Sequence, residues 1–224
     1  MYIIILKKTE MDKRPFPIEK ILIQYFNKRN NDIILVSPGY MSYTKKTIKN
    51  FCVEFCNLNT TSTNEFIFAK GMNGRNKVKN LSIDIVDEYY NNICQKNNQV
   101  RHSLFLTKND HSKFLIFIDK KSACIYDNKE LNVKELLSDF KTKVNAILLG
   151  SSNFSYNTYF NSPTDKGEAD IFMISENVFD NDDEIVGIIN GLRKENELDG
   201  ELILSKEMGI NQNLNILAQK LLKE

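Results

Sequence analysis

The sequence contains only two histidines and four cysteines among its 224 residues. The cysteines are Cys52, Cys56, Cys94 and Cys124, and no second closely spaced Cys/His pair completes the four ligands of a zinc site. We therefore expect no metal ion, and we interpret Cys52 and Cys56 as small buried apolar side chains. Few cysteines in a long chain favour a reducing compartment.

Long apolar runs are also missing from the sequence. No segment approaches the roughly 18 apolar residues that a membrane-spanning helix requires. The apolar start of the chain, residues 1–6, is too short for the core of a secretory signal and has no basic residues before it, so it fits a first strand. We therefore expect a cytoplasmic protein that does not associate with a membrane.

A strong charge of one sign is absent too, because the net charge is only +1. The charges are nevertheless distributed unevenly. Residues 1–50 carry ten Lys/Arg against four Asp/Glu, whereas residues 168–201 carry eleven acids against two bases. This asymmetry fits a polyanion-binding face opposite a repelling one, and it also fits two ordinary solvated faces. Both interpretations stay open.

Strand-like and helix-like patterns alternate along the chain, and this alternation predicts an α/β layered fold around one substantial core. We expect one domain over residues 1–199. Residues 200–224 read as a C-terminal helical extension or as the start of a further domain. The expected strands cover residues 1–6, 32–42, 64–71, 101–108, 111–120, 122–127, 144–155 and 168–175. The expected helices cover residues 44–57, 81–95, 132–140, 182–195 and 213–224.

The stretch HSKFLIFIDK, residues 111–120, is the most informative expected strand. Side chains alternate between the two faces of a strand, so His111 and Lys113 share one face. Both faces become apolar after the first three residues, which is typical of a strand covered on both sides. A buried ammonium without a partner is costly, and a histidine and a lysine at the lip of a buried sheet therefore indicate that an anion binds there.

A second polar group follows the apolar strand of residues 144–150. The sequence GSSNFS contains Gly150, Ser151, Asn153 and Ser155 at the expected strand-to-loop corner. Glycine permits a close backbone approach, and Ser and Asn side chains supply donors for phosphate oxygens. Small polar residues often follow strands, so this group alone is a weak signal.

In order along the chain, His111-Ser112-Lys113, the GSSNFS corner and Glu168 resemble the phospholipase D-like, or HKD, superfamily. The set is most similar to its single-motif nuclease branch, which includes metal-independent restriction endonucleases. The resemblance covers roughly residues 32–176 and implies a mixed central β-sheet with helices on both faces. The family pattern places an Asp seven residues after the His, where this chain has Ile118 and then Asp119. The connection from the first motif to the second is also longer here.

The resemblance implies a covalent mechanism that needs no cofactor. His111 would be the nucleophile and would form a phosphohistidine that water then hydrolyses. Glu168 would accept a hydrogen bond from the other ring nitrogen and so fix the tautomer. Asp170 competes with Glu168 for this orienting role.

A phosphodiester repels nucleophiles because it is charged, so a metal-free site must neutralise it with fixed donors. The resemblance assigns this role to Lys113 and Asn153, together with Ser151 or Ser155. Taken singly, these residues have ordinary structural interpretations. Lys113, for example, fits a surface lysine whose stem packs on apolar neighbours.

A second histidine must protonate the leaving oxygen, and the chain has only His102 besides His111. His102 lacks the spacing to a lysine that marks the motif, and we interpret it as a surface or strand-edge residue. The family carries two motifs per active site. We therefore expect a homodimer in which two copies share one active site around a twofold axis.

Three functions remain in competition. The leading interpretation is an endonuclease that acts on double-stranded DNA in restriction or defence, with Lys45, Lys46 and Lys49 contacting backbone phosphates. The alternatives are a lipid-acting phosphodiesterase and a non-catalytic nucleic-acid-binding subunit. The loop of residues 156–167 contains two tyrosines and a phenylalanine that stack bases in one interpretation and belong to a solvated insertion in the other.

Overall fold

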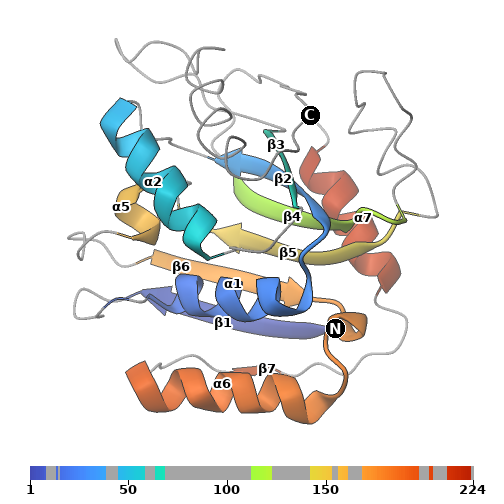
Figure 1. Ribbon diagram of the computed structural model, residues 1–224. Helices are drawn as coiled ribbons and strands as arrows, with labels where there is room; N and C mark the ends of the chain where they lie inside the picture. Colours follow the sequence, from blue (N-terminus) through green and yellow to red (C-terminus); the bar gives the residue numbers. More distant parts are fainter. Residues whose placement is uncertain are drawn as a thin grey trace.

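The computed structural model describes the chain in several ranges, which together contain the sheet and its flanking helices (Figure 1). All structural statements below concern these residues: 1–8, 14, 16–38, 45–58, 64–68, 112–122, 142–152, 156–160, 168–196, 202–203 and 211–222. The helix expected over 81–95 and the elements expected over 101–108, 122–127 and 132–140 lie outside them or only touch their edge. No helix within these ranges is long and apolar enough to cross a membrane.

A seven-stranded mixed sheet forms the centre of the fold (Figure 1). Its strands lie in the order β3-β2-β4-β5-β6-β1-β7, and only the β2–β3 pair is parallel. The strands are β1 (Tyr2–Lys8), β2 (Asp32–Pro38), β3 (Glu65–Phe68), β4 (Lys113–Asp119), β5 (Val144–Gly150), β6 (Glu168–Ile174) and β7 (Leu202–Ile203).

Helices cover both faces of this sheet. The first face carries α1 (Pro17–Lys28), α2 (Lys45–Asn57), the single turn α5 (Tyr156–Tyr159) and α6 (Asp182–Asn196), whose apolar residues join one core cluster with the strands. A short 3₁₀ turn over Glu176–Val178 precedes α6. The second face carries α7 (Asn211–Leu222), which buries Leu214 and Ala218 there. The expected mixed α/β architecture is therefore present.

Strand β4 shows the alternation that the sequence predicts. Leu115 and Phe117 belong to the core of the first face, and Phe114, Ile116 and Ile118 belong to the core of the second. All five side chains are buried. A strand in the middle of a two-sided sheet needs apolar residues at every position, which explains the unbroken run FLIFI. Lys113, at the start of β4, has the parity of Leu115 and so belongs to the first face.

The sequence patterns do not predict α1, although its buried residues have helical spacing: Ile18, Ile21, Leu22 and Tyr25. The helix begins with Pro17, and the Glu19 carboxylate accepts a hydrogen bond from the Phe16 backbone N–H at 2.9 Å. This bond satisfies one of the backbone donors that a helix start leaves unpaired. The start signal therefore comes from Glu19 and Pro17.

The C-terminal segment packs on the same sheet as the rest of the chain. β7 pairs with β1, and the Asn215 side chain of α7 accepts a hydrogen bond from the Val144 backbone at 3.0 Å and donates one to the Thr142 carbonyl at 2.6 Å. The division of the chain at residue 200 stays a prediction. Residues 211–222 nevertheless form part of the cover of the sheet's second face.

Candidate functional site

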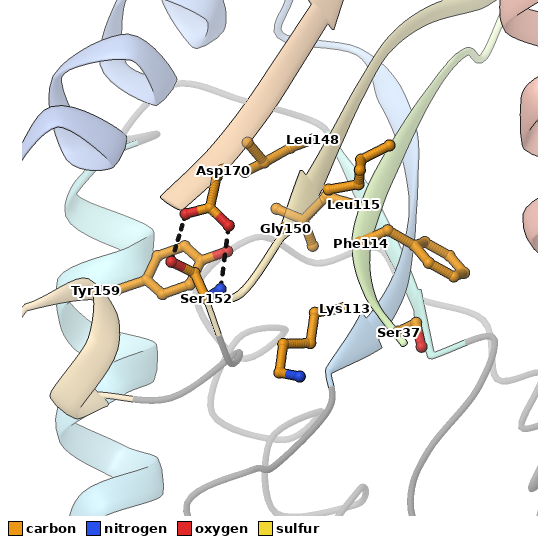
Figure 2. Close-up of a pocket in the computed structure, with 10 residues that line it drawn as sticks. Ser37, Lys113, Phe114, Leu115, Leu148, Gly150, Ser152, Tyr159 and Asp170 are labelled. Atoms are coloured by element: carbon orange, nitrogen blue, oxygen red, sulfur yellow. Dashed lines mark hydrogen bonds between the residues drawn. The ribbon is translucent and has the colours of Figure 1, made fainter. Parts of the chain in front are cut away.

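A pocket opens on the first face at the end of the sheet where β4 begins and β5 ends (Figure 2). It contains about 220 Å³ of empty space, part of which is open to solvent. We call it the Lys113 pocket, and its lining residues are Ser37, Lys113, Phe114, Leu115, Leu148, Leu149, Gly150, Ser152, Tyr159 and Asp170. The antiparallel pairing brings these residues together, because the start of β4 and the start of β6 lie at the same end as the end of β5.

Lys113 is the cation of this pocket. It lies opposite Pro38 of β2 and is partly buried. Burial lowers the pKa of the Lys113 ammonium, and the negative charges of Glu168 and Asp170 act against that decrease. The lysine that the sequence places at the lip of a buried sheet is therefore found there, facing two carboxylates of β6.

Gly150 brings the ends of β5 and β6 unusually close. A Cβ atom at Gly150 would lie 2.3 Å from Asp170 Oδ1 and 2.4 Å from the Ala169 carbonyl oxygen. Real side chains do not reach such distances, so β6 or the Asp170 side chain would have to shift. The glycine of the GSSNFS group thus makes room for the Asp170 carboxylate.

Ser152 holds that carboxylate by both of its oxygens. The Ser152 backbone N–H donates to Asp170 Oδ1 at 3.1 Å, and the Ser152 hydroxyl donates to Asp170 Oδ2 (Figure 2). Asp170 is only 5% exposed. Burial raises the pKa of the Asp170 carboxyl, and the charge of Glu168 adds to the increase, whereas the bonds from Ser152 oppose it.

Ser151 is engaged with the neighbouring acid. Its hydroxyl donates to Glu168 Oε2 and accepts a hydrogen bond from the Ala169 N–H at 2.9 Å. The Ser151 N–H also donates to the Ala169 carbonyl at 3.0 Å. The single hydroxyl proton of Ser151 is directed at Glu168, so a phosphate oxygen at this corner would have to compete for it.

The base-stacking interpretation is wrong for Tyr159 and Phe160, and it stays a prediction for the partly buried Tyr156. Residues 156–159 form the helical turn α5, and Tyr159 and Phe160 are buried in the core. The Tyr159 ring packs against that of Phe51 in α2, with centroids 5.8 Å apart. Tyr159 also lines the Lys113 pocket, a role that the sequence interpretation missed. The spacing of Tyr156, Tyr159 and Phe160 is that of one helical face and is the signal that would have revealed it.

The basic run lies on α2, outside the residues that line the pocket. Lys46 and Lys49 are exposed, and Lys45 is the first residue of the helix. The opposite side of α2 buries Phe51 and Phe55, which pack against Tyr159 of α5. The exposed lysines therefore belong to a helix that contacts one wall of the pocket.

The structure thus brings together three of the expected site residues: Lys113, Ser151 and Glu168. His111, Asn153 and Ser155 lie outside the described residues, as does His102. Within the described ranges, no group of three or more His, Cys, Asp or Glu side chains is arranged to hold a metal ion.

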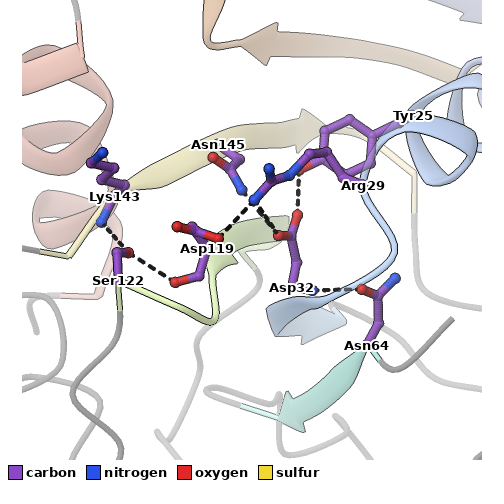
Figure 3. A network of polar contacts seen from close by, with 8 residues as sticks. All are labelled: Tyr25, Arg29, Asp32, Asn64, Asp119, Ser122, Lys143 and Asn145. Atoms are coloured by element: carbon purple, nitrogen blue, oxygen red, sulfur yellow. Dashed lines mark hydrogen bonds and ion pairs between the residues drawn. The ribbon is translucent and has the colours of Figure 1, made fainter. Parts of the chain in front are cut away.

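A second polar group lies at the opposite end of the same strands (Figure 3). We call it the Asp32 cluster, and its members are Tyr25, Arg29, Asp32, Asn64, Asp119 and Asn145. The buried Asp32 carboxylate accepts hydrogen bonds from the Tyr25 hydroxyl at 2.6 Å and from Asn145 at 3.0 Å. Burial raises the pKa of Asp32, and these bonds, with the charge of Arg29, oppose the increase.

Asp119 belongs to this cluster, where its carboxylate accepts a hydrogen bond from Arg29 at 2.8 Å. It stands one residue beyond the position at which the family pattern has its Asp. Asp119 lies at the end of β4, and Lys113 lies at the start. The cluster ties α1 to three strands of the sheet, and Asp119 has a structural role there rather than a place in the pocket.

No family model matches this chain, and no curated protein matches it.

Proposed function

We propose that this protein is a phospholipase D-like phosphodiesterase that hydrolyses DNA without a metal ion. One observation supports the proposal most: Lys113, the Gly150–Ser152 corner and the acids at the start of β6 line or border one pocket although they are far apart in the sequence. A mixed sheet with helices on both faces is also compatible with this family.

In the proposed reaction a ring nitrogen of His111 attacks the phosphorus atom. The bond between phosphorus and the leaving oxygen breaks, and an acid protonates that oxygen. Water then attacks the phosphorus and breaks the P–N bond, which returns the histidine. Because the chain has one motif, the acid is His111 of the partner subunit in a twofold dimer.

Fixed donors neutralise the phosphate in this proposal. Lys113 supplies a partly buried ammonium, which acts more strongly on a bound phosphate than a fully solvated ammonium does. Asn153 and Ser155 supply further donors, and Ser151 joins them once its hydroxyl turns away from Glu168. The freed Glu168 carboxylate then orients the ring of His111.

The DNA backbone follows α2 in this proposal. Lys46 and Lys49 are exposed on the helix that packs against α5, so cations lie on an element next to the pocket. Contacts of this kind attract any nucleic acid and carry no sequence information. We therefore propose restriction or defence as the role only in combination with a recognition element outside the described residues.

The test is cleavage of plasmid and single-stranded DNA in excess EDTA, with wild type beside His111→Ala and Asp183→Asn. Asp183 is exposed on α6, so its replacement controls for preparation and charge. We expect wild type and Asp183→Asn to cleave the DNA, and His111→Ala not to cleave it. Cleavage that requires magnesium and survives His111→Ala would contradict it.

A non-catalytic nucleic-acid-binding subunit is the second candidate function. The observation in its favour is that the described part of the site holds two carboxylates, Glu168 and Asp170, against one ammonium, Lys113. This balance weakens the attraction for a phosphate. DNA binding without cleavage, unchanged by His111→Ala, would support this candidate. Hydrolysis of a phospholipid but not of DNA would instead indicate a lipid-acting enzyme.

A further inference from the structure

Asp170 is a buried carboxylate to which the proposed reaction gives no task. It lies on the same face of β6 as Glu168, but the two side chains differ in their surroundings. Glu168 is partly exposed and bonded to Ser151, whereas Asp170 lines the Lys113 pocket and is held by Ser152 through both oxygens. Each carboxylate therefore has its own serine from the same corner of the chain.

The local backbone is shaped around the Asp170 side chain. Gly150 stands directly opposite Asp170 in the β5–β6 pairing, and any Cβ at Gly150 would collide with Asp170 Oδ1. The Ser152 N–H is aimed at the same oxygen. A buried carboxylate destabilises the folded state unless hydrogen bonds or an opposite charge stabilise it, because burial disfavours the ionised form.

We propose that Asp170 is a positioning residue of the Lys113 pocket, which fixes the Gly150–Ser152 corner and presents a negative charge to the Lys113 ammonium. Figure 2 shows the carboxylate and the lysine on two sides of the pocket, with Ser152 bonded to the carboxylate. The consequence of the Asp170 charge for catalysis rests on the proposed function, whereas the effect of that charge on Lys113 does not.

The physical need for such a charge follows from the burial of Lys113. Burial favours the neutral amine, and a neutral lysine cannot neutralise a phosphate. Among the described residues, the titratable groups that face Lys113 are Glu168 and Asp170 from β6 and Tyr159 from α5. Burial and the charge of Asp170 keep the pKa of Tyr159 well above its ordinary value, so Tyr159 is neutral. Among these three described groups, the two carboxylates are the ones that support the ammonium.

The test measures the pKa of Lys113 by NMR of protein labelled with ¹³C at lysine Cε. The Lys113 signal is assigned by its loss in Lys113→Arg. Asp170→Asn keeps the shape of the side chain and removes its charge, so we expect a lower Lys113 pKa in this variant than in wild type. Asp183→Asn removes a charge on exposed α6 and should leave the pKa unchanged. An unchanged or higher pKa of Lys113 in Asp170→Asn would overturn the proposal.

A second readout is the pH dependence of binding of dimethyl phosphate, a diester whose charge stays constant over the range used. The ammonium form of Lys113 binds the anion, so affinity falls as the pH rises through the pKa of Lys113. In Asp170→Asn this fall should occur at lower pH than in wild type. A residue that only supported the fold would weaken binding equally at all pH values, and that result would also count against the proposal.

Two outcomes separate this inference from the proposed function. If wild type does not cleave DNA but the pKa of Lys113 falls in Asp170→Asn, the inference stands and the proposed function fails. If wild type cleaves and the pKa of Lys113 does not move, the proposed function stands and the inference fails. Should Asp170→Asn not fold, the smaller Asp170→Ser takes its place. It also removes the negative charge, so the pKa of Lys113 should again fall, and no change would overturn the inference.

Discussion

At one end of the sheet the Asp32 carboxylate is fully buried and accepts hydrogen bonds from Tyr25, Arg29 and Asn145, whereas at the other end Lys113 and Asp170 line a pocket open to solvent. Both groups contain charged side chains, and β4 contributes one to each group, Asp119 to the Asp32 cluster and Lys113 to the pocket. The Asp32 cluster pairs its charges with one another, which suits a structural role. The Lys113 pocket has an ammonium and a carboxylate among its lining residues, which suits a role in binding.

We call the end of the sheet with the Asp32 cluster the closed end, and the end with the Lys113 pocket the open end. The largest effect should come from Asp32→Ala, which disrupts the closed end. The change leaves the Tyr25 hydroxyl and the Asn145 amide without their acceptor and Arg29 with less of its opposing charge. We expect a loss of about 3–5 kcal/mol in the free energy of unfolding, measured by urea denaturation. The exposed Asp183→Ala serves as control and, because Asp183 lies in the first turn of α6, should lower stability by no more than about 1 kcal/mol. A loss of that small size for Asp32→Ala would contradict the structural role.

Lys113→Ala should instead lower the cleavage rate without lowering stability. The proposed function expects the cleavage rate to fall about 10²–10³-fold, the usual effect of removing one donor to a developing charge. Stability should stay the same or increase, because burial disfavours the ammonium. Kinetics and denaturation on the same preparation test both halves. Lost stability with an unchanged cleavage rate would place Lys113 with the structural residues instead.

Gly150→Ala should damage the open end through packing alone. Its new Cβ meets Asp170 and the Ala169 carbonyl, so we expect a loss of about 1–3 kcal/mol in stability. The matched control is Gly187→Ala in α6, where a Cβ meets nothing within 4 Å and should stabilise the helix by about 0.5–1 kcal/mol. Thermal denaturation compares the two. Equal changes in both variants would show that β5 and β6 are not closely packed at Gly150.

Replacement of Lys45, Lys46 and Lys49 by Gln should have the smallest effect. The slope of log affinity for DNA against log salt should fall by about 0.9 for every lysine that contacts a phosphate. Lys121→Gln is the control, because this exposed lysine follows β4 at the closed end. Fluorescence anisotropy at several salt concentrations gives the slope, and an unchanged slope would remove α2 from the DNA interface.

The sequence predicted the open end better than the closed one, for a physical reason. Lys113 and Gly150 stand at the ends of apolar runs, and such runs mark strands that are covered on both sides. The Asp32 cluster joins Arg29, Asp119 and Asn145 through pairings distant in the chain, and no local pattern carries that information. The place of α1 was also missed, because its start is capped by Glu19 rather than by Ser, Thr, Asp or Asn at the N-cap.

The environments of the two acids of β6 could not be predicted either. Glu168 and Asp170 have the same parity along the strand, so the sequence left open which of them orients the histidine. Gly150 lies close against Asp170, which is buried and accepts hydrogen bonds from Ser152. The more exposed Glu168 accepts its hydrogen bond from Ser151. That separation depends on how β5 and β6 pair, and it gives the two acids different tasks in the proposal.

The most direct test of the proposed phosphodiesterase site is to trap the covalent intermediate on His111. Wild type is mixed with a short DNA duplex in EDTA, quenched in alkali, in which phosphohistidine is stable, and digested for mass spectrometry. We expect a DNA fragment attached through phosphorus to the peptide that contains His111, and no such adduct in His111→Ala. Cleavage by wild type with no adduct on His111, or with an adduct on another residue, would contradict the assignment of the open end as a phosphodiesterase site.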